Sequence, residues 1–224
     1  MMTSKITNTM AKNGLLLAGF AIFTTGLIAL TYFGTKDQIV LQQQQKLLNI
    51  LNAVIDEKSY DNVIQQDCVL VRSEAFLGLE QPQHIYRATQ NKQPVAVAIE
   101  TTAVDGYSGQ IHLVVGITNA PAGSAKVTGV RVLEHKETPG LGDKIDLRVS
   151  NWVLDFENQV YNADVADNWA VKKDNGMFDQ FTGATITPRA VVNAVKLAAE
   201  YYLANQDSIF KAPNACVLNT NDNK

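Results

Sequence analysis

An uncharged stretch of 20 residues, from Gly14 to Phe33, constrains this chain more than any other feature. Fourteen of these residues are hydrophobic, and the rest are glycine or threonine. A helix of this length spans about 30 Å, the thickness of the hydrocarbon core of a bilayer. Glycine and threonine are tolerated there because a helix satisfies its own backbone hydrogen bonds. The stretch therefore predicts one transmembrane helix over residues 14–33.

A cleaved signal peptide is the alternative interpretation of this stretch. The apolar run is longer than the usual core of a signal peptide, about 7–15 residues, and no pair of small residues marks a cleavage site after it. We therefore favour a retained anchor. Lys5 and Lys12 precede the stretch without any acid, whereas Lys36 and Asp37 cancel after it. The positive-inside rule then places residues 1–13 in the cytoplasm and the remainder of the chain outside.

The rest of the chain has the composition of an ordinary globular domain. Hydrophobic residues make up 46% of the whole sequence, which excludes a disordered chain and a multispan membrane protein. Beyond the anchor, 17 Lys and Arg stand against 22 Asp and Glu, a net charge of −5. This sign disfavours nucleic acid and anionic membrane surfaces as partners. We expect a stalk or first helix over 34–58, one folded domain over 59–212 and a loose tail over 213–224.

Local patterns predict helices at both ends of the domain and strands between them. Residues 38–58 have apolar side chains at helical spacing, which suits a stalk continuing the membrane helix or a first core helix equally well. Four short β-branched runs follow, at 85–88, 95–101, 111–117 and 127–135. Short links between them, such as the hairpin expected at 106–109, favour an antiparallel sheet.

Two further helices are expected after the strands. Residues 145–156 predict a short helix, and residues 188–204 predict a longer one with apolar residues at three-four spacing. Pro188 suits the first turn of the longer helix, and Thr187 suits its N-cap. The predicted fold class is therefore α+β: one N-terminal transmembrane helix, then an antiparallel sheet covered by helices.

Conventional catalytic sets are missing from the sequence. His84, His112 and His135 are scattered, and the latter two are interpreted as structural or surface groups. Neither a zinc-protease motif, a serine-hydrolase motif nor a phosphate-binding P-loop occurs. We therefore expect no catalytic side-chain set and no metal site.

The only two cysteines, Cys68 and Cys216, show neither CxxC nor metal-ligand spacing. In an oxidising exterior they could form a disulfide. We favour two unpaired thiols, because one of them lies in the polar tail, and the pairing stays open at this point.

Two loops carry the remaining candidates for function. The first covers residues 135–143, where Pro139 and Gly140 suit a type II turn. Gly142 adds a second place where the backbone can approach a ligand closely. Taken alone, this stretch is also what a tight surface loop looks like.

The second loop covers residues 179–189 and leads into the last predicted helix. Two hydroxyls, on Thr182 and Thr185, are separated only by the small Gly183 and Ala184. A helix N-terminus presents free N–H groups and the positive end of the helix dipole, so it favours a phosphate group. The plain alternative is a capped helix start without a ligand.

Three motifs, at residues 132–145, 168–173 and 179–195, closely resemble the G subunit of the Rnf ion-translocating electron transport complex, and the likeness includes the N-terminal anchor. The C subunit of the sodium-pumping NADH:quinone reductase shares the flavin-binding domain and is the alternative. The resemblance implies FMN joined to Thr185 by a phosphoester bond. It also implies a flavin transferase that uses FAD as donor and recognises Asp179.

The resemblance further implies which residues surround the cofactor. The first loop is expected near the flavin, and FMN itself carries the redox chemistry, so no catalytic side chain is needed. Besides Thr185, the expected cofactor-binding residues are Thr182, Gly183, Ala184, Glu137, Thr138, Leu141 and Gly142.

Location and partners follow from the same resemblance. It implies a single-pass protein of the bacterial inner membrane, with a cytoplasmic N-terminus and a periplasmic flavin domain. Its partners would be the other membrane and redox subunits of an Rnf-type complex that exchanges electrons between ferredoxin and NAD. This component alone would have little turnover. The alternative from another class is an anchored scaffold without a cofactor.

Overall fold

A computed structural model describes residues 2–216 of the chain, which divide into two compact units between Lys46 and Leu47. Helix α1 (Met2–Val54) runs through the first unit and into the second. It is the one helix among the described residues that is long and apolar enough to cross a membrane. Thr24 and Thr31 donate hydroxyl hydrogen bonds to carbonyls four residues back, at 2.9 and 2.8 Å, so these polar groups are satisfied within the helix. The predicted single apolar helix is confirmed.

The last turns of α1 belong to the folded domain. Leu51 and Val54 are fully buried, so the helix both continues from the apolar stretch and ends in a core. Two glycines opposite each other on neighbouring strands, Gly116 and Gly129, accommodate this helix end. A Cβ on Gly116 would lie 2.2 Å from the Val54 carbonyl oxygen, and one on Gly129 would lie 2.9 Å from the Val54 Cα. Glycine at both positions therefore allows the helix to pack directly on the sheet.

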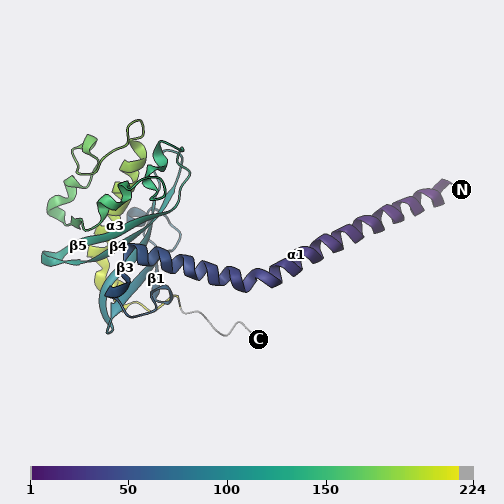
Figure 1. The fold of residues 1–224 in the computed structure, drawn as a ribbon, viewed down its shortest axis with the longest axis horizontal. Helices are drawn as coiled ribbons and strands as arrows, with labels where there is room; N and C mark the ends of the chain where they lie inside the picture. Colours follow the sequence, from purple (N-terminus) through teal and green to yellow (C-terminus); the bar gives the residue numbers. More distant parts are fainter. Residues whose placement is uncertain (1, 217–224) are drawn as a thin grey trace. The chain divides into compact units, whose positions relative to one another are not determined.

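One antiparallel sheet forms the centre of the domain (Figure 1), and its strands are hydrogen-bonded in sequence order. Its strands are β1 (Cys68–Val71), β2 (Gln83–Gln90), β3 (Gln93–Ala103), β4 (Ile111–Ala120), β5 (Ser124–Glu134) and β6 (Val160–Tyr161). The four predicted strands correspond to β2–β5, and the antiparallel α+β class is confirmed. The edge strands β1 and β6 were not predicted because four and two residues are too few to show an alternating pattern.

Helix α3 (Ile186–Lys211) packs against strands β3, β4 and β5 and buries one apolar side. Its buried face contains several small residues, including Ala190, Ala194 and Ala198, which let the helix approach the sheet closely. The other helical segments are short: α2 (Glu74–Leu77) and the 3₁₀ turns Glu57–Ser59, Ile64–Gln66, Pro121–Gly123, Gly142–Ile145, Trp152–Phe156, Ala163–Asn168 and Lys172–Asp174.

The short helix predicted over 145–156 is wrong. The segment forms two separate 3₁₀ turns, Gly142–Ile145 and Trp152–Phe156. Asp146 interrupts it, because its carboxylate accepts the backbone N–H of Arg148 at 2.9 Å in place of a helical bond. The guanidinium of Arg148 also pairs with this carboxylate and lowers the pKa of Asp146.

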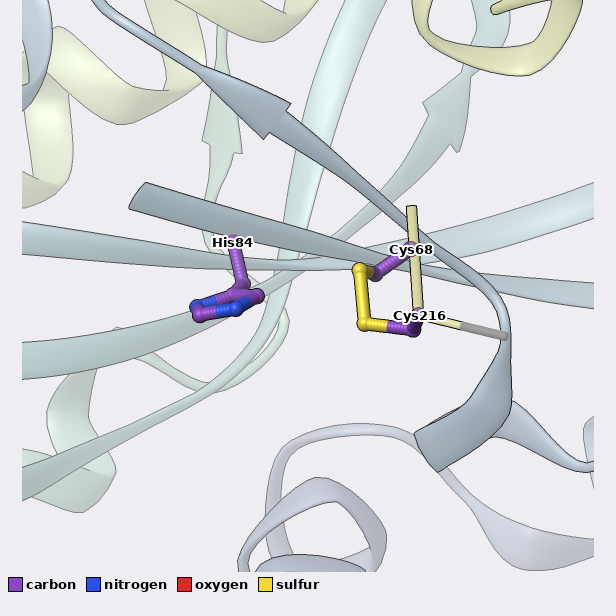
Figure 2. Close-up of side chains that lie close together, drawn as sticks. All are labelled: Cys68, His84 and Cys216. Carbon is purple, nitrogen blue, oxygen red and sulfur yellow. A yellow bond between two sulfur atoms is a disulfide. The ribbon is translucent and has the colours of Figure 1, made fainter. Parts of the chain in front are cut away.

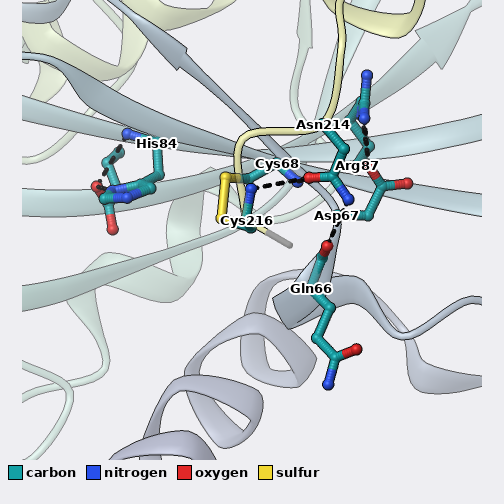
Figure 3. The surroundings of a disulfide bond; sticks show 8 residues. Gln66, Asp67, Cys68, His84, Arg87, Asn214 and Cys216 are labelled. Atoms are coloured by element: carbon teal, nitrogen blue, oxygen red, sulfur yellow. Dashed lines mark hydrogen bonds and ion pairs between the residues drawn. A yellow bond between two sulfur atoms is a disulfide. The ribbon is translucent and has the colours of Figure 1, made fainter. Parts of the chain in front are cut away.

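The expectation of two unpaired thiols is also wrong, because Cys68 and Cys216 form a disulfide (Figure 3). Their separation of 148 residues leaves no local signal of pairing in the sequence. Residues 214–216, within the stretch expected to be loose, are held against β1: the backbone N–H groups of Cys68 and Cys216 both donate to Asn214 Oδ1, at 3.1 and 2.9 Å. Residues 217–224 of that stretch lie outside the described residues.

Candidate functional site

The two loops singled out in the sequence meet at one cavity of about 320 Å³. Glu137, Thr138, Leu141 and Gly142 line it from the first loop, and Gly183, Ala184 and Thr185 from the second. The remaining lining residues are Tyr107, Ile186 and Thr187. The structure thus brings together seven of the eight expected cofactor-binding residues. Thr182 is exposed and is not among the lining residues.

The first loop forms the type II turn expected from its sequence. The N–H of Leu141 donates to the carbonyl of Thr138 at 3.1 Å and closes the turn. Gly140 occupies the third position with a φ of +79°, a conformation that side-chain-bearing residues rarely adopt. The turn directs Leu141 and Gly142 to the cavity wall.

Glu137 connects three segments around the cavity. Its side chain is buried; Oε1 accepts the backbone N–H of Ser108 at 2.9 Å, and Oε2 accepts the hydroxyl of Thr187 at 2.5 Å. A Cβ on Gly142 would lie 2.6 Å from Oε2, so glycine is needed there to leave room for this carboxylate. Both carboxylate oxygens of Glu137 therefore already accept hydrogen bonds from the protein. Its role at the cavity is to link the first loop to the segments that contain Ser108 and Thr187.

The second loop begins with a tight turn. The N–H of Ala184 donates to the carbonyl of Phe181 at 3.1 Å, and Gly183 has a φ of +81°. A Cβ on Gly183 would meet only the Leu141 side chain, at 3.7 Å, so backbone conformation and not space requires glycine. Phe181 fixes the turn because its ring is buried against Trp152, with ring centroids 5.1 Å apart.

Thr185, not Thr187, is the N-cap of α3, which corrects the predicted helix start. The hydroxyl of Thr187 is buried and donates to Glu137, so it is used in packing. Thr185 is half-buried at the cavity wall, and its side chain caps no backbone N–H of the helix. A hydroxyl oxygen therefore lies at the N-terminus of a 26-residue helix without a capping role.

Charged groups near the second loop are paired with each other. Asp179 lies outside the cavity, exposed, with its carboxylate 2.6 Å from Lys172 Nζ. Arg189 donates two hydrogen bonds to Asp174, at 2.6 and 2.8 Å, and these lower the pKa of that carboxyl. The positive charge of Arg189 is therefore already neutralised by Asp174. The partial positive charge at the N-terminus of α3 remains next to Thr185 in the sequence.

Sequence reasoning missed two exposed apolar residues at the cavity, Tyr107 and Ile186, which are 68% and 45% exposed. Tyr107 lies in the connection between β3 and β4, which was interpreted only as a hairpin. The sequence did contain a signal for Tyr107. An aromatic residue in a short hairpin connection is expected to be exposed, and an exposed apolar side chain can mark a binding site. His112 and His135 do not line the cavity; they contact Thr102 and the backbone N–H of Glu137, respectively.

Replacing Glu137 by methionine is expected to lower the free energy of unfolding by about 1–3 kcal/mol, because the donors on Ser108 and Thr187 lose their acceptor. Urea unfolding followed by tryptophan fluorescence measures this. Glu137→Gln keeps an acceptor oxygen for Ser108 and a polar group for Thr187, so it should lose less. The exposed Glu134→Gln is the matched control, expected to stay within about 0.5 kcal/mol of wild type. Equal losses for Glu137→Met and Glu134→Gln would contradict the bridging role.

Known proteins give the family of this chain. The model of the FMN-binding domain matches residues 106–200, and that of the RnfG N-terminal region matches residues 1–54. The chain is 65% identical to the G subunit of the ion-translocating oxidoreductase complex of Pseudoalteromonas atlantica, covering 92% of this chain and 94% of the relative. Proteins of the same name from Vibrio cholerae and Aliivibrio fischeri are 57% and 51% identical, covering 92% and 93% of this chain and 96% and 97% of the relatives. The chain therefore belongs to the family of G subunits of ion-translocating oxidoreductase complexes.

Proposed function

We propose that this chain is a membrane-anchored flavoprotein subunit that relays electrons through FMN covalently attached to Thr185, within an ion-translocating complex of the Rnf type. One observation carries the proposal: Thr185 stands at the wall of a cavity and at the N-terminus of α3. Every residue that lines this cavity falls inside the part of the chain that matches the FMN-binding domain. The names of the relatives support the place in an ion-translocating complex.

The residues at the cavity fit a phosphate-linked flavin. A phosphoester on the Thr185 hydroxyl would lie beside the free N–H groups of the first turn of α3, where negative charge is stabilised. Tyr107, Leu141 and Ile186 offer apolar surface to a flat ring system. FMN would supply the electron-transfer chemistry, and the residues that line the cavity would position it.

Attachment requires a transfer reaction at the Thr185 hydroxyl. With FAD as donor, a bond forms between Thr185 Oγ1 and the FMN phosphorus, the pyrophosphate bond breaks, AMP leaves and the hydroxyl proton is released. A flavin transferase would catalyse this and recognise Asp179. The exposed Asp179 carboxylate, 61% accessible, supports that role because an enzyme can reach it by displacing Lys172.

The proposed topology places residues 1–13 in the cytoplasm and the flavin domain in the periplasm of a bacterial inner membrane. The Cys68–Cys216 disulfide supports this orientation, because disulfides persist in oxidising compartments. A covalent bond to the cofactor suits that compartment, since a dissociated FMN would be lost. The other membrane and redox subunits of the complex would then be the electron partners.

The absorption spectrum of the purified full-length chain, produced with and without an active flavin transferase, tests the function. We expect a yellow protein with a flavin spectrum only when the transferase is present. A colourless protein under both conditions would contradict the proposal and indicate a cofactor-free scaffold. Subunits that co-purify from native membranes would show whether the complex is of the Rnf type or a sodium-pumping quinone reductase.

A further inference from the structure

A second cluster of chemically reactive side chains consists of Cys68, His84 and Cys216 (Figure 2). The two sulfur atoms of Cys68 and Cys216 and a ring nitrogen of His84 all lie within 4.8 Å of one another. They come from β1, β2 and the segment after α3, which explains why no spacing motif joins them in the sequence. None of the three residues lines the cavity at Thr185.

His84 is oriented in the way metal-binding histidines usually are. Its Nδ1 lies 2.8 Å from Glu100 Oε2, and its ring stacks on Tyr86 with centroids 5.6 Å apart. Metal-binding histidines almost always donate their second ring N–H to a carboxylate or carbonyl, which fixes the tautomer and the ring orientation. With Nδ1 bound to Glu100, Nε2 is the nitrogen left for a metal ion.

Hydrogen bonds that do not involve sulfur also hold the two cysteine segments together around the disulfide (Figure 3). Asn214 Oδ1 accepts the N–H groups of both Cys68 and Cys216, and its Nδ2 donates to the carbonyl of Gln66 at 2.7 Å. Ala215 adds a backbone hydrogen bond to the carbonyl of Cys68 at 2.8 Å. These bonds do not involve sulfur, so reduction of the disulfide does not itself remove them.

The spacing of the two cysteines fits a shared metal ion. Thiolates on a tetrahedral zinc ion are about 3.8 Å apart, given zinc–sulfur bonds of about 2.3 Å. The Cα atoms of Cys68 and Cys216 are 5.2 Å apart, so rotation of the two side chains can open the sulfurs to that distance. The His84 side chain is 40% exposed, so water reaches this member of the cluster.

We propose that Cys68, His84 and Cys216 form a redox-controlled metal site, closed as a disulfide when oxidised and able to bind Zn²⁺ when reduced. A dithiol reductant supplies two electrons and two protons, breaks the S–S bond and becomes a disulfide itself. Zinc then displaces the two thiol protons and accepts the lone pair of His84 Nε2. Two thiolates and one imidazole match the preference of zinc for sulfur and nitrogen ligands.

Zinc titration of the full-length chain in detergent, without a polyhistidine tag, tests the site. The protein is reduced with an immobilised phosphine and titrated with Zn²⁺ against a chromophoric chelator, and with Co²⁺ for its thiolate absorption bands. We expect one equivalent bound to the reduced protein and none to the oxidised protein. His84→Ala should weaken binding at least tenfold, and Glu100→Gln should weaken it by about 10–100-fold.

His112→Ala is the matched control. His112 also lies in a strand, β4, but its ring contacts Thr102, so this variant should leave the zinc affinity unchanged. Circular dichroism of the oxidised His84→Ala protein checks that its fold is retained. A reduced wild type that binds no Zn²⁺, or binds it no more tightly than His84→Ala, would overturn the site. Flavin-free Thr185→Val protein should bind zinc like wild type, so this test is independent of the proposed function.

Discussion

The Thr185→Val variant is expected to carry no covalent flavin when it is produced with an active flavin transferase, whereas the wild-type chain is labelled. Valine keeps the shape of threonine but lacks the oxygen that would form the phosphoester. Thr185 is the only threonine in the loop whose side chain is both at the cavity wall and outside the packing around Glu137. Flavin fluorescence of the denatured protein in a gel measures the loss, which should be complete.

Two neighbouring threonines provide matched controls. Thr182→Val changes an exposed hydroxyl away from the cavity and should keep its covalent flavin. Thr187→Val removes the hydrogen bond to Glu137, so it should keep the flavin but unfold more easily. Fluorescent Thr185→Val protein, or loss of label in Thr182→Val alone, would show that the attachment site is assigned wrongly.

Removing the disulfide should be the largest change in stability. We expect the Cys68→Ser/Cys216→Ser double variant to lose about 2–5 kcal/mol of unfolding free energy. The bond closes a loop with a sequence separation of 148, which contains all six strands and α3. Opening so long a loop gives the unfolded chain much more conformational freedom, and the chain-entropy estimate for it is about 5 kcal/mol.

Urea unfolding of the full-length protein in detergent, followed by the fluorescence of buried Trp152 and Trp169, measures this loss. Asn214→Ala is a useful comparison, because it removes the hydrogen bonds around the disulfide and leaves the bond itself. Since Asn214 is exposed, this variant should cost only about 0.5–1.5 kcal/mol. Unchanged stability of the double-serine variant would mean that the bond does not constrain the mature protein.

Local periodicity explains which parts of this fold could be predicted. The apolar stretch at 14–33, the four long strands and α3 each repeat their pattern over enough residues to identify the element. The failures at 145–156 and Thr187 have one cause. In both places a side chain makes a hydrogen bond that the spacing of apolar residues cannot predict. Asp146 accepts the backbone N–H of Arg148, and Thr187 donates to Glu137.

Long-range contacts explain what the sequence could not show about the site. The turn at Gly140 and the hydroxyl of Thr185 were recognisable, because turn chemistry and helix starts are local. The closeness of Glu137 to Thr187, 50 residues apart, depends on the complete sheet. The same applies to Gly116 and Gly129, whose role appears only when the end of α1 is seen packed on them.

Mass spectrometry of the tryptic peptide spanning residues 174–189, taken from protein purified out of native membranes, tests the central claim most directly. This peptide contains Asp179 and the three threonines Thr182, Thr185 and Thr187. We predict a peptide heavier by one FMN less one water, with fragment ions that place the added mass on Thr185. An unmodified peptide as the only form, or a flavin on Thr182 or Thr187, would contradict the account.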